Sequence, residues 1–163
     1  MHKAVVITVS DSTARGERED LSGPAVAETL RKAGFDVIGC ETVPDEIAPI
    51  KKALTDACAV AAMVVTTGGT GLAARDVTPE ATRAVCDRLA EGVAEHMRSE
   101  GMKRTPFAAL SRGVCGIRGS SLILNLPGSP KGAVESLEAV LILLSHALEL
   151  LAGNTSHACQ QDS

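Results

Sequence analysis

The chain has 163 residues, of which 45% are hydrophobic and 22% are charged, and its formal net charge is −4. This length suits one domain, and this composition excludes a chain that is disordered over most of its length. An acidic chain with two Phe and no Tyr or Trp also lacks the basic patches and aromatic platforms that bind nucleic acid.

Membrane-spanning and export segments are not expected either. The longest apolar run, at residues 57–65, is far shorter than the ~18 residues of a membrane-spanning helix. The first residues lack the long apolar stretch and the cleavage site of a signal peptide. We therefore expect a cytoplasmic protein that contacts neither membranes nor nucleic acid.

The first half of the chain alternates between strand and helix patterns. Strands are predicted at residues 4–9, 35–43 and 61–65. Between them lie a helix from Ser22 to Gly34 and a helix that begins at Asp45. Pro49 indicates that the second helix starts late or bends in its first turn. This β-α-β-α-β order predicts an α/β fold with a mostly parallel sheet covered on both faces by helices.

The second half is predicted to contain more helices and one hairpin. Helices are expected at 78–90, where Thr78 and Pro79 cap and open the helix, at 92–100, and from Ser129-Pro130 to Leu151; strands at 114–117 and 120–126 form an antiparallel hairpin added to the sheet. The last helix is apolar nearly all round between residues 139 and 144, which indicates deep burial or a subunit interface. Residues 1–152 form one predicted domain, and residues 153–163 a disordered polar tail.

The cysteines and histidines do not predict a metal centre. Five cysteines are present, at positions 40, 58, 86, 115 and 159, without a Cys-x-x-Cys pair. We interpret them as reduced thiols packed as small hydrophobic side chains. His157 and Cys159 share the polar tail, but two ligands without partners make a weak site. We therefore expect no structural zinc.

The strongest local motif is Thr66-Thr-Gly-Gly-Thr-Gly71, at the carboxyl end of a predicted strand. Ligands of open α/β sheets bind at this edge, and glycines let backbone amides approach an oxyanion. The motif predicts a phosphate cradle; the alternative is a tight turn needed only for packing. It is neither a dinucleotide fingerprint, because no helix begins before Thr78, nor a P-loop, because no Gly-Lys-Ser/Thr ends it.

Two aspartates follow predicted strands near this motif. Asp76 lies five residues after Gly71 and suits a Mg²⁺ shared with substrate phosphates, or it accepts hydrogen bonds from its own loop. Asp45 follows the second strand and either faces the same ligand or caps a helix. Ser129 and Lys131, at another strand-to-helix junction, predict a further anion contact; the alternative is a capped helix with a solvated lysine.

No Ser/His/Asp or Cys/His arrangement predicts a protein nucleophile. None of the four histidines falls in a glycine-marked loop. Chemistry that needs only positioning, Mg²⁺ and charge stabilisation remains, and phosphoryl and nucleotidyl transfer fit that description.

Six segments occur in order along the chain: Val9-Ser10-Asp11, Val43-Pro44-Asp45-Glu46, Thr67-Gly-Gly-Thr-Gly71, Arg75-Asp-Val-Thr-Pro79, Leu110-Ser-Arg112 and Asn125-Leu-Pro-Gly-Ser-Pro-Lys131. Together they resemble the Mog/MoaB family of molybdenum cofactor biosynthesis over about residues 3–151. The resemblance implies a three-layer α/β/α fold of the molybdopterin-binding type, a homotrimer, and Mg²⁺-dependent transfer of AMP from ATP to molybdopterin with release of pyrophosphate. The product would pass to a molybdenum insertase.

The resemblance also implies roles for individual residues. Asp45 and Asp76 would be catalytic and would hold Mg²⁺ through the substrate phosphates. The substrate contacts would come from Ser10, Asp11, Thr67, Gly68, Gly69, Thr70, Gly71, Ser111, Gly128, Ser129, Pro130 and Lys131. Two other hypotheses stay open: a non-catalytic MoaB-type molybdopterin carrier, and a nucleotide sensor without pterin chemistry.

Overall fold

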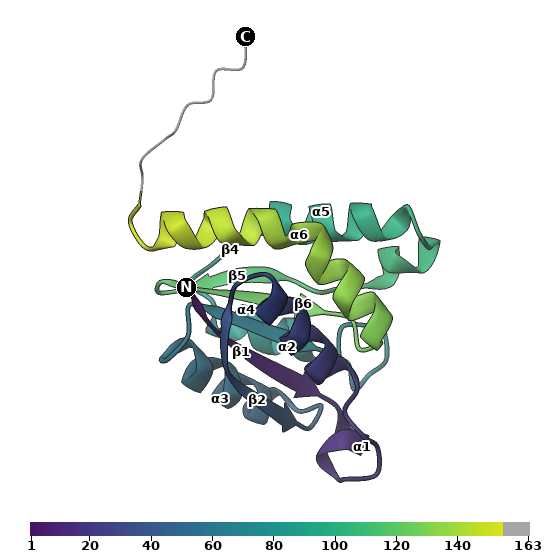
Figure 1. The fold of residues 1–163 in the computed structure, drawn as a ribbon. Helices are drawn as coiled ribbons and strands as arrows, with labels where there is room; N and C mark the ends of the chain where they lie inside the picture. The colour runs from purple at the N-terminus through teal and green to yellow at the C-terminus, as the bar shows by residue number, and fades with distance from the viewer. Residues whose placement is uncertain (155–163) are drawn as a thin grey trace.

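The computed structural model describes residues 1–154, whose central sheet lies between two layers of helices (Figure 1). The strands are β1 (Lys3–Val9), β2 (Asp36–Val43), β3 (Met63–Thr67), β4 (Arg88–Leu89), β5 (Cys115–Arg118) and β6 (Ser121–Leu126). Their order is β2-β1-β3-β6-β5-β4; β1, β2, β3 and β6 are parallel, while β5 is antiparallel to β6 and β4. The predicted fold class, including the antiparallel hairpin, is confirmed.

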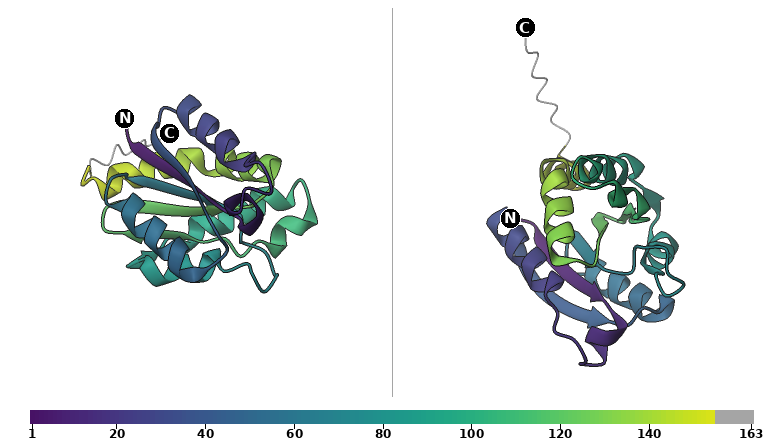
Figure 2. Two further views of the ribbon diagram at one scale, coloured as in Figure 1. Left: turned by 90° about the horizontal axis from the view of Figure 1, so that it is seen from below. Right: turned by 90° about the vertical axis from the view of Figure 1, so that its right-hand side faces the viewer.

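The helices are α1 (Asp11–Ala14), α2 (Ser22–Lys32), α3 (Ile47–Cys58), α4 (Thr78–Val85), α5 (Glu91–Met102) and α6 (Pro130–Leu151), with a 3-10 helix, η1 (Pro106–Leu110). Helices α2, α5 and α6 pack on one face of the sheet, and α3 and α4 on the other (Figures 1 and 2). Each face therefore has its own apolar core.

Strand β3 shows how the sequence builds both cores. Its side chains alternate: Met63 and Val65 pack toward the α2, α5 and α6 layer, and Val64 packs toward α3 and α4. All three are 0% exposed, which explains why the segment reads as an unbroken apolar run rather than as an alternating one. Strand β3 is therefore buried along its whole length, as β6 is.

The order of the strands creates the place where a ligand can bind. From β1 the chain passes through α2 to β2 on one side, and then through α3 to β3 on the other side of β1. The two crossover helices lie on opposite faces, so they diverge at the carboxyl ends of β1 and β3. Such a divergence leaves a crevice in parallel α/β sheets.

Several predicted boundaries are wrong. The helix expected at 78–90 ends at Val85, because the chain turns into β4 and pairs with β5. Strand β3 ends at Thr67 rather than Val65, since its pairing with β1 and β6 continues through the threonines. Helix α1 and η1 were not predicted; each is held by one polar cap, from Ser10 and Thr105 respectively.

Two of the three helix caps considered from the sequence differ from the structure. Asp45 does not cap α3, whose N-cap residue is Glu46 without a side-chain cap bond. Thr78 is the first residue of α4, and the N-cap residue is Val77. Both side chains are instead engaged in contacts with other loops. The cap of α6 is as predicted, because the Ser129 hydroxyl accepts a hydrogen bond from the Gly132 amide at 3.2 Å.

Helix α6 is not buried all round. Val140 and Leu144 are fully buried, but Ile142 is 80% exposed and Leu143 and Leu150 are also exposed. Deep burial, one of the two interpretations of its apolar sequence, is therefore wrong. The subunit interface remains a prediction.

Three of the four cysteines within residues 1–154 fit the predicted packing role. Cys58, Cys86 and Cys115 are free thiols that are at least partly buried, and burial raises the pKa of Cys86 to about 11 and that of Cys115 to about 12. Cys40, on the edge strand β2, is exposed instead. None of the helices within residues 1–154 has the length and apolar character needed to cross a bilayer. Of the predicted tail, all but Gly153 and Asn154 lies outside the described residues.

A buried polar cluster joins β3, β6 and α4 beneath the crevice. The Asn125 side-chain amide donates to the hydroxyls of Thr66, at 3.0 Å, and Thr82, at 2.9 Å. Its carbonyl oxygen accepts from the Val114 amide at 3.2 Å. Asn125, Thr66 and Thr82 are all 0% exposed. Because every polar group in the cluster has a partner, its burial is tolerated.

We expect Asn125→Ala to lower the free energy of unfolding by about 2–3 kcal/mol, because it leaves the buried Val114 amide and the Thr66 hydroxyl without a partner. Urea unfolding followed by circular dichroism measures this cost. Asn154→Ala is the control, since Asn154 bonds Glu149 on the surface, and its cost should stay below about 0.5 kcal/mol. Equal effects of the two substitutions would contradict the structural role of Asn125.

Candidate functional site

Two cavities lie side by side at the carboxyl ends of the parallel strands. The larger, of about 650 Å³, lies between the β3–α4 loop, the end of α5, η1 and α6. The smaller, of about 420 Å³, lies between the end of β1, the α1–α2 loop and the same β3–α4 loop. Four residues line both cavities: Gly69, Asp76, Gly128 and Ser129. The shared wall therefore combines a glycine turn, a carboxylate and the beginning of α6.

The walls of the two cavities differ in chemistry. The larger cavity has apolar walls from Phe107, Leu110 and Ala139. It also contains three glutamates and one arginine, namely Glu100, Glu135, Glu138 and Arg104. The smaller cavity is lined by hydroxyls and by one cation, Arg18, besides its carboxylates. The larger cavity suits a planar heterocycle. The smaller one has four carboxylates, Glu19, Asp20, Asp45 and Asp76, against one arginine, and it suits a phosphate-bearing ligand that arrives with a cation.

The glycine turn between β3 and α4 is held by Thr78. The Thr78 hydroxyl donates to the Gly68 carbonyl at 2.9 Å, and the Thr78 amide donates to the Gly69 carbonyl at 3.1 Å. Both carbonyls of the turn are thus engaged away from the cavities. Gly68 and Gly69 have φ values of +92° and +67°, and a Cβ would collide with the Val9 carbonyl at the first and with the Thr78 hydroxyl at the second. Only glycine fits at these positions.

Asp76 is positioned by its own loop and by Arg112. Its Oδ2 accepts a hydrogen bond from the Ala73 amide at 3.0 Å. Asp76 therefore does accept a bond from its own loop, as its structural alternative predicts. The Arg112 guanidinium donates to the carbonyls of Gly71, at 2.8 Å, and Asp76, at 2.6 Å, and pairs with Glu80. Arg112 therefore fixes the backbone on both sides of the loop. Its only sequence signal is its place in Leu110-Ser-Arg112.

Asp45 exchanges hydrogen bonds with Asp11. The Asp11 amide donates to Asp45 Oδ2 at 2.8 Å, and the Asp45 amide donates to Asp11 Oδ1 at 2.9 Å. This reciprocal pair ties the start of α1 to the β2–α3 turn. Burial raises the pKa of Asp45, and repulsion from Asp11 and Asp76 adds to it. The hydrogen bonds from Arg75 lower the pKa of Asp11.

Most of the predicted site residues line the two cavities. The larger cavity is lined by Thr70, Gly71 and Ser111, the smaller by Ser10, Asp45, Thr67, Gly68 and Pro130, and both by Gly69, Asp76, Gly128 and Ser129. Asp11 and Lys131 line neither. The Lys131 side chain is 87% exposed, with its Nζ 4.0 Å from Glu135, as in its alternative interpretation as a solvated lysine.

Several lining residues had no signal in the sequence. Phe107 and Arg104 lie in and before η1, a segment without helical or strand periodicity. Arg104 Nη1 and Glu135 Oε1, on two residues that line the larger cavity, are 2.9 Å apart, although the residues are distant in the chain. Arg18 lies in the polar stretch between α1 and α2. Contacts of this kind depend on tertiary packing, which local patterns do not encode.

Residues 5–146 match the family described as "Probable molybdopterin binding domain". The chain belongs to this molybdopterin-binding-domain family. The match extends from β1 into α6 and includes every loop that lines the two cavities.

Similar proteins have two kinds of name, molybdopterin adenylyltransferase and MoaB. A molybdopterin adenylyltransferase of Helicobacter pylori strain J99 is 44% identical over 91% of this chain and 87% of its own length. The molybdopterin adenylyltransferase of Escherichia coli K12 is 44% identical over 83% of this chain and 71% of its own. A crystal structure described as the molybdopterin biosynthesis enzyme MoaB, from Thermus thermophilus, is 54% identical, with a TM-score of 0.89 over 94% of this chain and 98% of that one.

Asp45 and Asp76 could hold a magnesium ion together with a phosphate-bearing ligand. Within residues 1–154, no three His, Cys, Asp or Glu side chains are grouped as metal ligands. Asp45 and Asp76 nevertheless line one cavity and repel each other. Mg²⁺ commonly binds through one or two carboxylates plus substrate phosphates. The two aspartates therefore fit an ion that arrives with a phosphate-bearing ligand.

We expect Asp45→Asn to stabilise the folded protein by up to about 1 kcal/mol at neutral pH, because it removes a desolvated and repelled charge while an amide oxygen still accepts from Asp11. A raised pKa means that Asp45 costs stability only once it ionises, so the gain should grow as the pH rises through that pKa. Melting temperatures at about pH 4 and about pH 8 measure this dependence. Asp36→Asn, on the exposed edge of β2, is the control, and equal shifts in both variants would contradict the assignment.

Proposed function

We propose that the chain is a molybdopterin adenylyltransferase, which transfers AMP from Mg-ATP to molybdopterin and releases pyrophosphate. One observation carries this proposal: two chemically different cavities share a wall made of a glycine turn, a carboxylate and a helix start. Two bound molecules would meet there with their phosphates adjacent. The name of the 44% identical relatives, molybdopterin adenylyltransferase, supports molybdopterin as one substrate and an adenylyl donor as the other.

The larger cavity would hold the pterin and the smaller one ATP. A pterin ring is flat and carries N–H donors on one edge, which match apolar walls with carboxylates such as Glu138. The triphosphate would lie near Arg18, the only lysine or arginine among the described residues that line the smaller cavity. Glu138 and Arg18 were not among the predicted site residues.

The chemistry would need no nucleophile from the protein. An oxygen of the molybdopterin phosphate would bond to the α-phosphorus of ATP, the bond from that phosphorus to the bridging oxygen of the β-phosphate would break, and pyrophosphate would leave with the electron pair. The glycine turn and the first amides of α6 would hold the oxyanions. Asp45 and Asp76 would hold Mg²⁺, which neutralises phosphate charge when bound.

Magnesium dependence, homotrimer formation, cytoplasmic location and delivery of the product to a molybdenum insertase are further parts of this proposal. The exposed apolar side chains of α6, Ile142, Leu143 and Leu150, support association of copies. Large apolar side chains gathered on one surface commonly mark such contacts.

A non-catalytic molybdopterin carrier is the second candidate, because the larger cavity could hold a pterin without any use of the smaller one. A carrier would use the larger cavity alone. It would bind molybdopterin without consuming ATP. A nucleotide sensor would do the reverse and bind ATP while ignoring molybdopterin.

Pyrophosphate release from Mg-ATP decides between these functions. We expect release only when molybdopterin is present, and we expect Asp76→Asn to slow it by about a hundredfold or more, because it removes charge from the metal–phosphate site. Asp36→Asn, the same change at an exposed residue that lines neither cavity, should leave release unchanged. Molybdopterin binding without pyrophosphate release, by a folded wild-type protein, would favour the carrier.

Gly71→Ala tests whether the position of Asp76 matters. The added Cβ would lie 2.8 Å from Asp76 Oδ2, and Gly71 does not have a positive φ, so the carboxylate should move while the fold persists. We expect turnover to fall about tenfold or more with little change in melting temperature, since misplacing a catalytic group by about 1 Å costs up to ~10²-fold. Gly92→Ala, with open space around its Cβ, should leave turnover unchanged. Unaltered turnover in Gly71→Ala would argue against a catalytic Asp76.

A further inference from the structure

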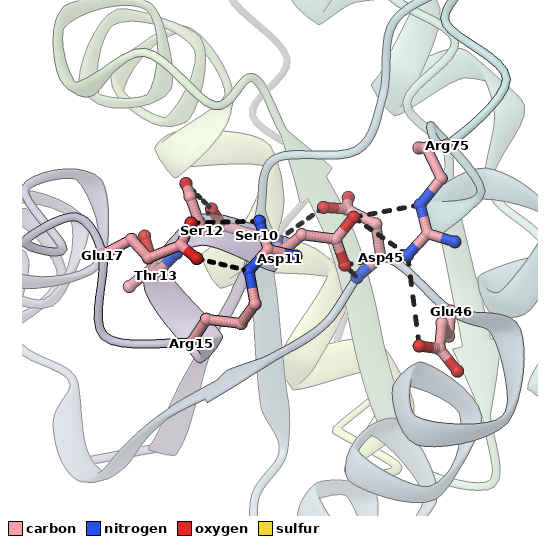
Figure 3. A network of polar contacts seen from close by, with 9 residues as sticks. All are labelled: Ser10, Asp11, Ser12, Thr13, Arg15, Glu17, Asp45, Glu46 and Arg75. Carbon is pink, nitrogen blue, oxygen red and sulfur yellow. Dashed lines mark hydrogen bonds and ion pairs between the residues drawn. The ribbon is translucent and has the colours of Figure 1, made fainter.

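Arg75 connects the loop that carries Asp76 to the residues that hold Asp45. Its Nε donates to Asp11 Oδ2 at 3.0 Å and its Nη2 donates to Asp11 Oδ1 at 2.9 Å (Figure 3). Its Nη2 also lies 4.0 Å from Glu46 Oε1. The guanidinium and the carboxylate thus form a bidentate salt bridge, which fixes the orientation of the two side chains as well as their distance.

Arg75 and Asp11 do not form part of either cavity wall. The Asp11 side chain is only 22% exposed, and its carboxylate is occupied by Arg75 and by the Asp45 amide. Neither group is therefore placed to contact a ligand directly. Arg75 is linked to Asp45 through Asp11, whose Oδ1 accepts hydrogen bonds both from Arg75 and from the amide of Asp45.

The loop is held at its other side by Arg112. That side chain bonds the carbonyls of Gly71 and Asp76, and the Arg112 amide donates to the Thr70 carbonyl at 2.8 Å. Arg112 thus ties Asp76 to the strand β5 side of the site. Arg75, the residue directly before Asp76, ties the same loop to β1 and β2 through Asp11 and Asp45.

We propose that Arg75 is a positioning residue, whose pairing with Asp11 sets the separation between the Asp45 and Asp76 carboxylates. The inference rests on the proposed function, because that separation matters only if both carboxylates serve one metal–phosphate site. Without the pair, the β3–α4 loop keeps its anchor on Arg112 and loses its link to Asp45. Outer partners that orient metal-holding groups typically change metal affinity 10–100-fold when removed.

A neighbouring ion pair provides a matched control. Arg15 Nε donates to Glu17 Oε1 at 2.9 Å, also in a two-pronged pairing, in the turn that follows α1 (Figure 3). Arg15 and Arg75 are almost equally exposed, at 59% and 60%. Glu17 forms no hydrogen bond with Asp45 or Asp76 among the described contacts. Arg15→Gln therefore removes a similar pair and leaves the hydrogen bonds of the proposed link in place; it also removes a charge that acts on Asp11, although less than that of Arg75.

The experiment measures Mn²⁺ binding by electron paramagnetic resonance, with and without α,β-methylene-ATP, whose α–β linkage cannot be cleaved. We expect the Mn²⁺ dissociation constant in the ternary complex to rise about tenfold or more in Arg75→Gln and to stay unchanged in Arg15→Gln. Arg75→Lys keeps the positive charge but cannot form the bidentate pair, so its Mn²⁺ dissociation constant should lie between those of the wild type and Arg75→Gln. In a double-mutant cycle, Asp11→Asn should add little to Arg75→Gln.

The other outcomes separate the two levels of the proposal. If Asp45→Asn weakens Mn²⁺ binding while Arg75→Gln does not, the positioning role is wrong and the metal site stands. If neither substitution changes Mn²⁺ binding, the proposed metal site itself fails, and with it the inference. If Arg75→Gln raises the KM for ATP with unchanged Mn²⁺ affinity, Arg75 contacts the nucleotide and the positioning role is excluded.

Discussion

The hydrogen bonds from Thr78 to the two glycine carbonyls are the contacts on which the rest of the site depends. They turn the β3–α4 loop away from the sheet, leave no room for a side chain on Gly69, and place Asp76 two residues before α4. The buried amide of Asn125 supports them from below, because it bonds Thr82, whose hydroxyl donates back to the Thr78 carbonyl. Strand pairing, helix start and loop conformation are thus one connected unit.

The aspartates beside this loop destabilise the free protein electrostatically. Asp45, Asp11 and Asp76 lie close enough for their charges to oppose the ionisation of Asp45, and only Asp11 has a strong arginine partner. A protein selected for stability alone would not retain such an arrangement. Functional sites commonly sacrifice stability in this way, because the ligand or its metal supplies the missing positive charge. Binding then relieves the repulsion among the carboxylates, and this relief adds to the affinity for the ligand.

The sequence predicted the parallel strands, the glycine turn and the N-cap of α6 because each is encoded locally. Val64 and Val65 form a buried apolar run, and Ser129-Pro130 is a local helix start. It failed where tertiary contacts decide, because β4 forms only by pairing with β5. It also left two roles open for Asp45, and the contact with Asp11 excludes the helix cap. Arg112 and Arg75 could be quoted as motif residues, but their partners lie more than 30 residues away in the chain.

The wall shared by the two cavities has a consequence for any molecule that fills both. Once one half is bound at Gly69 and Gly128, the other half is confined next to its own cavity at a high effective concentration. A covalently joined ligand therefore binds more tightly than either of its parts, and it dissociates more slowly. Bisubstrate analogues should exploit this effect.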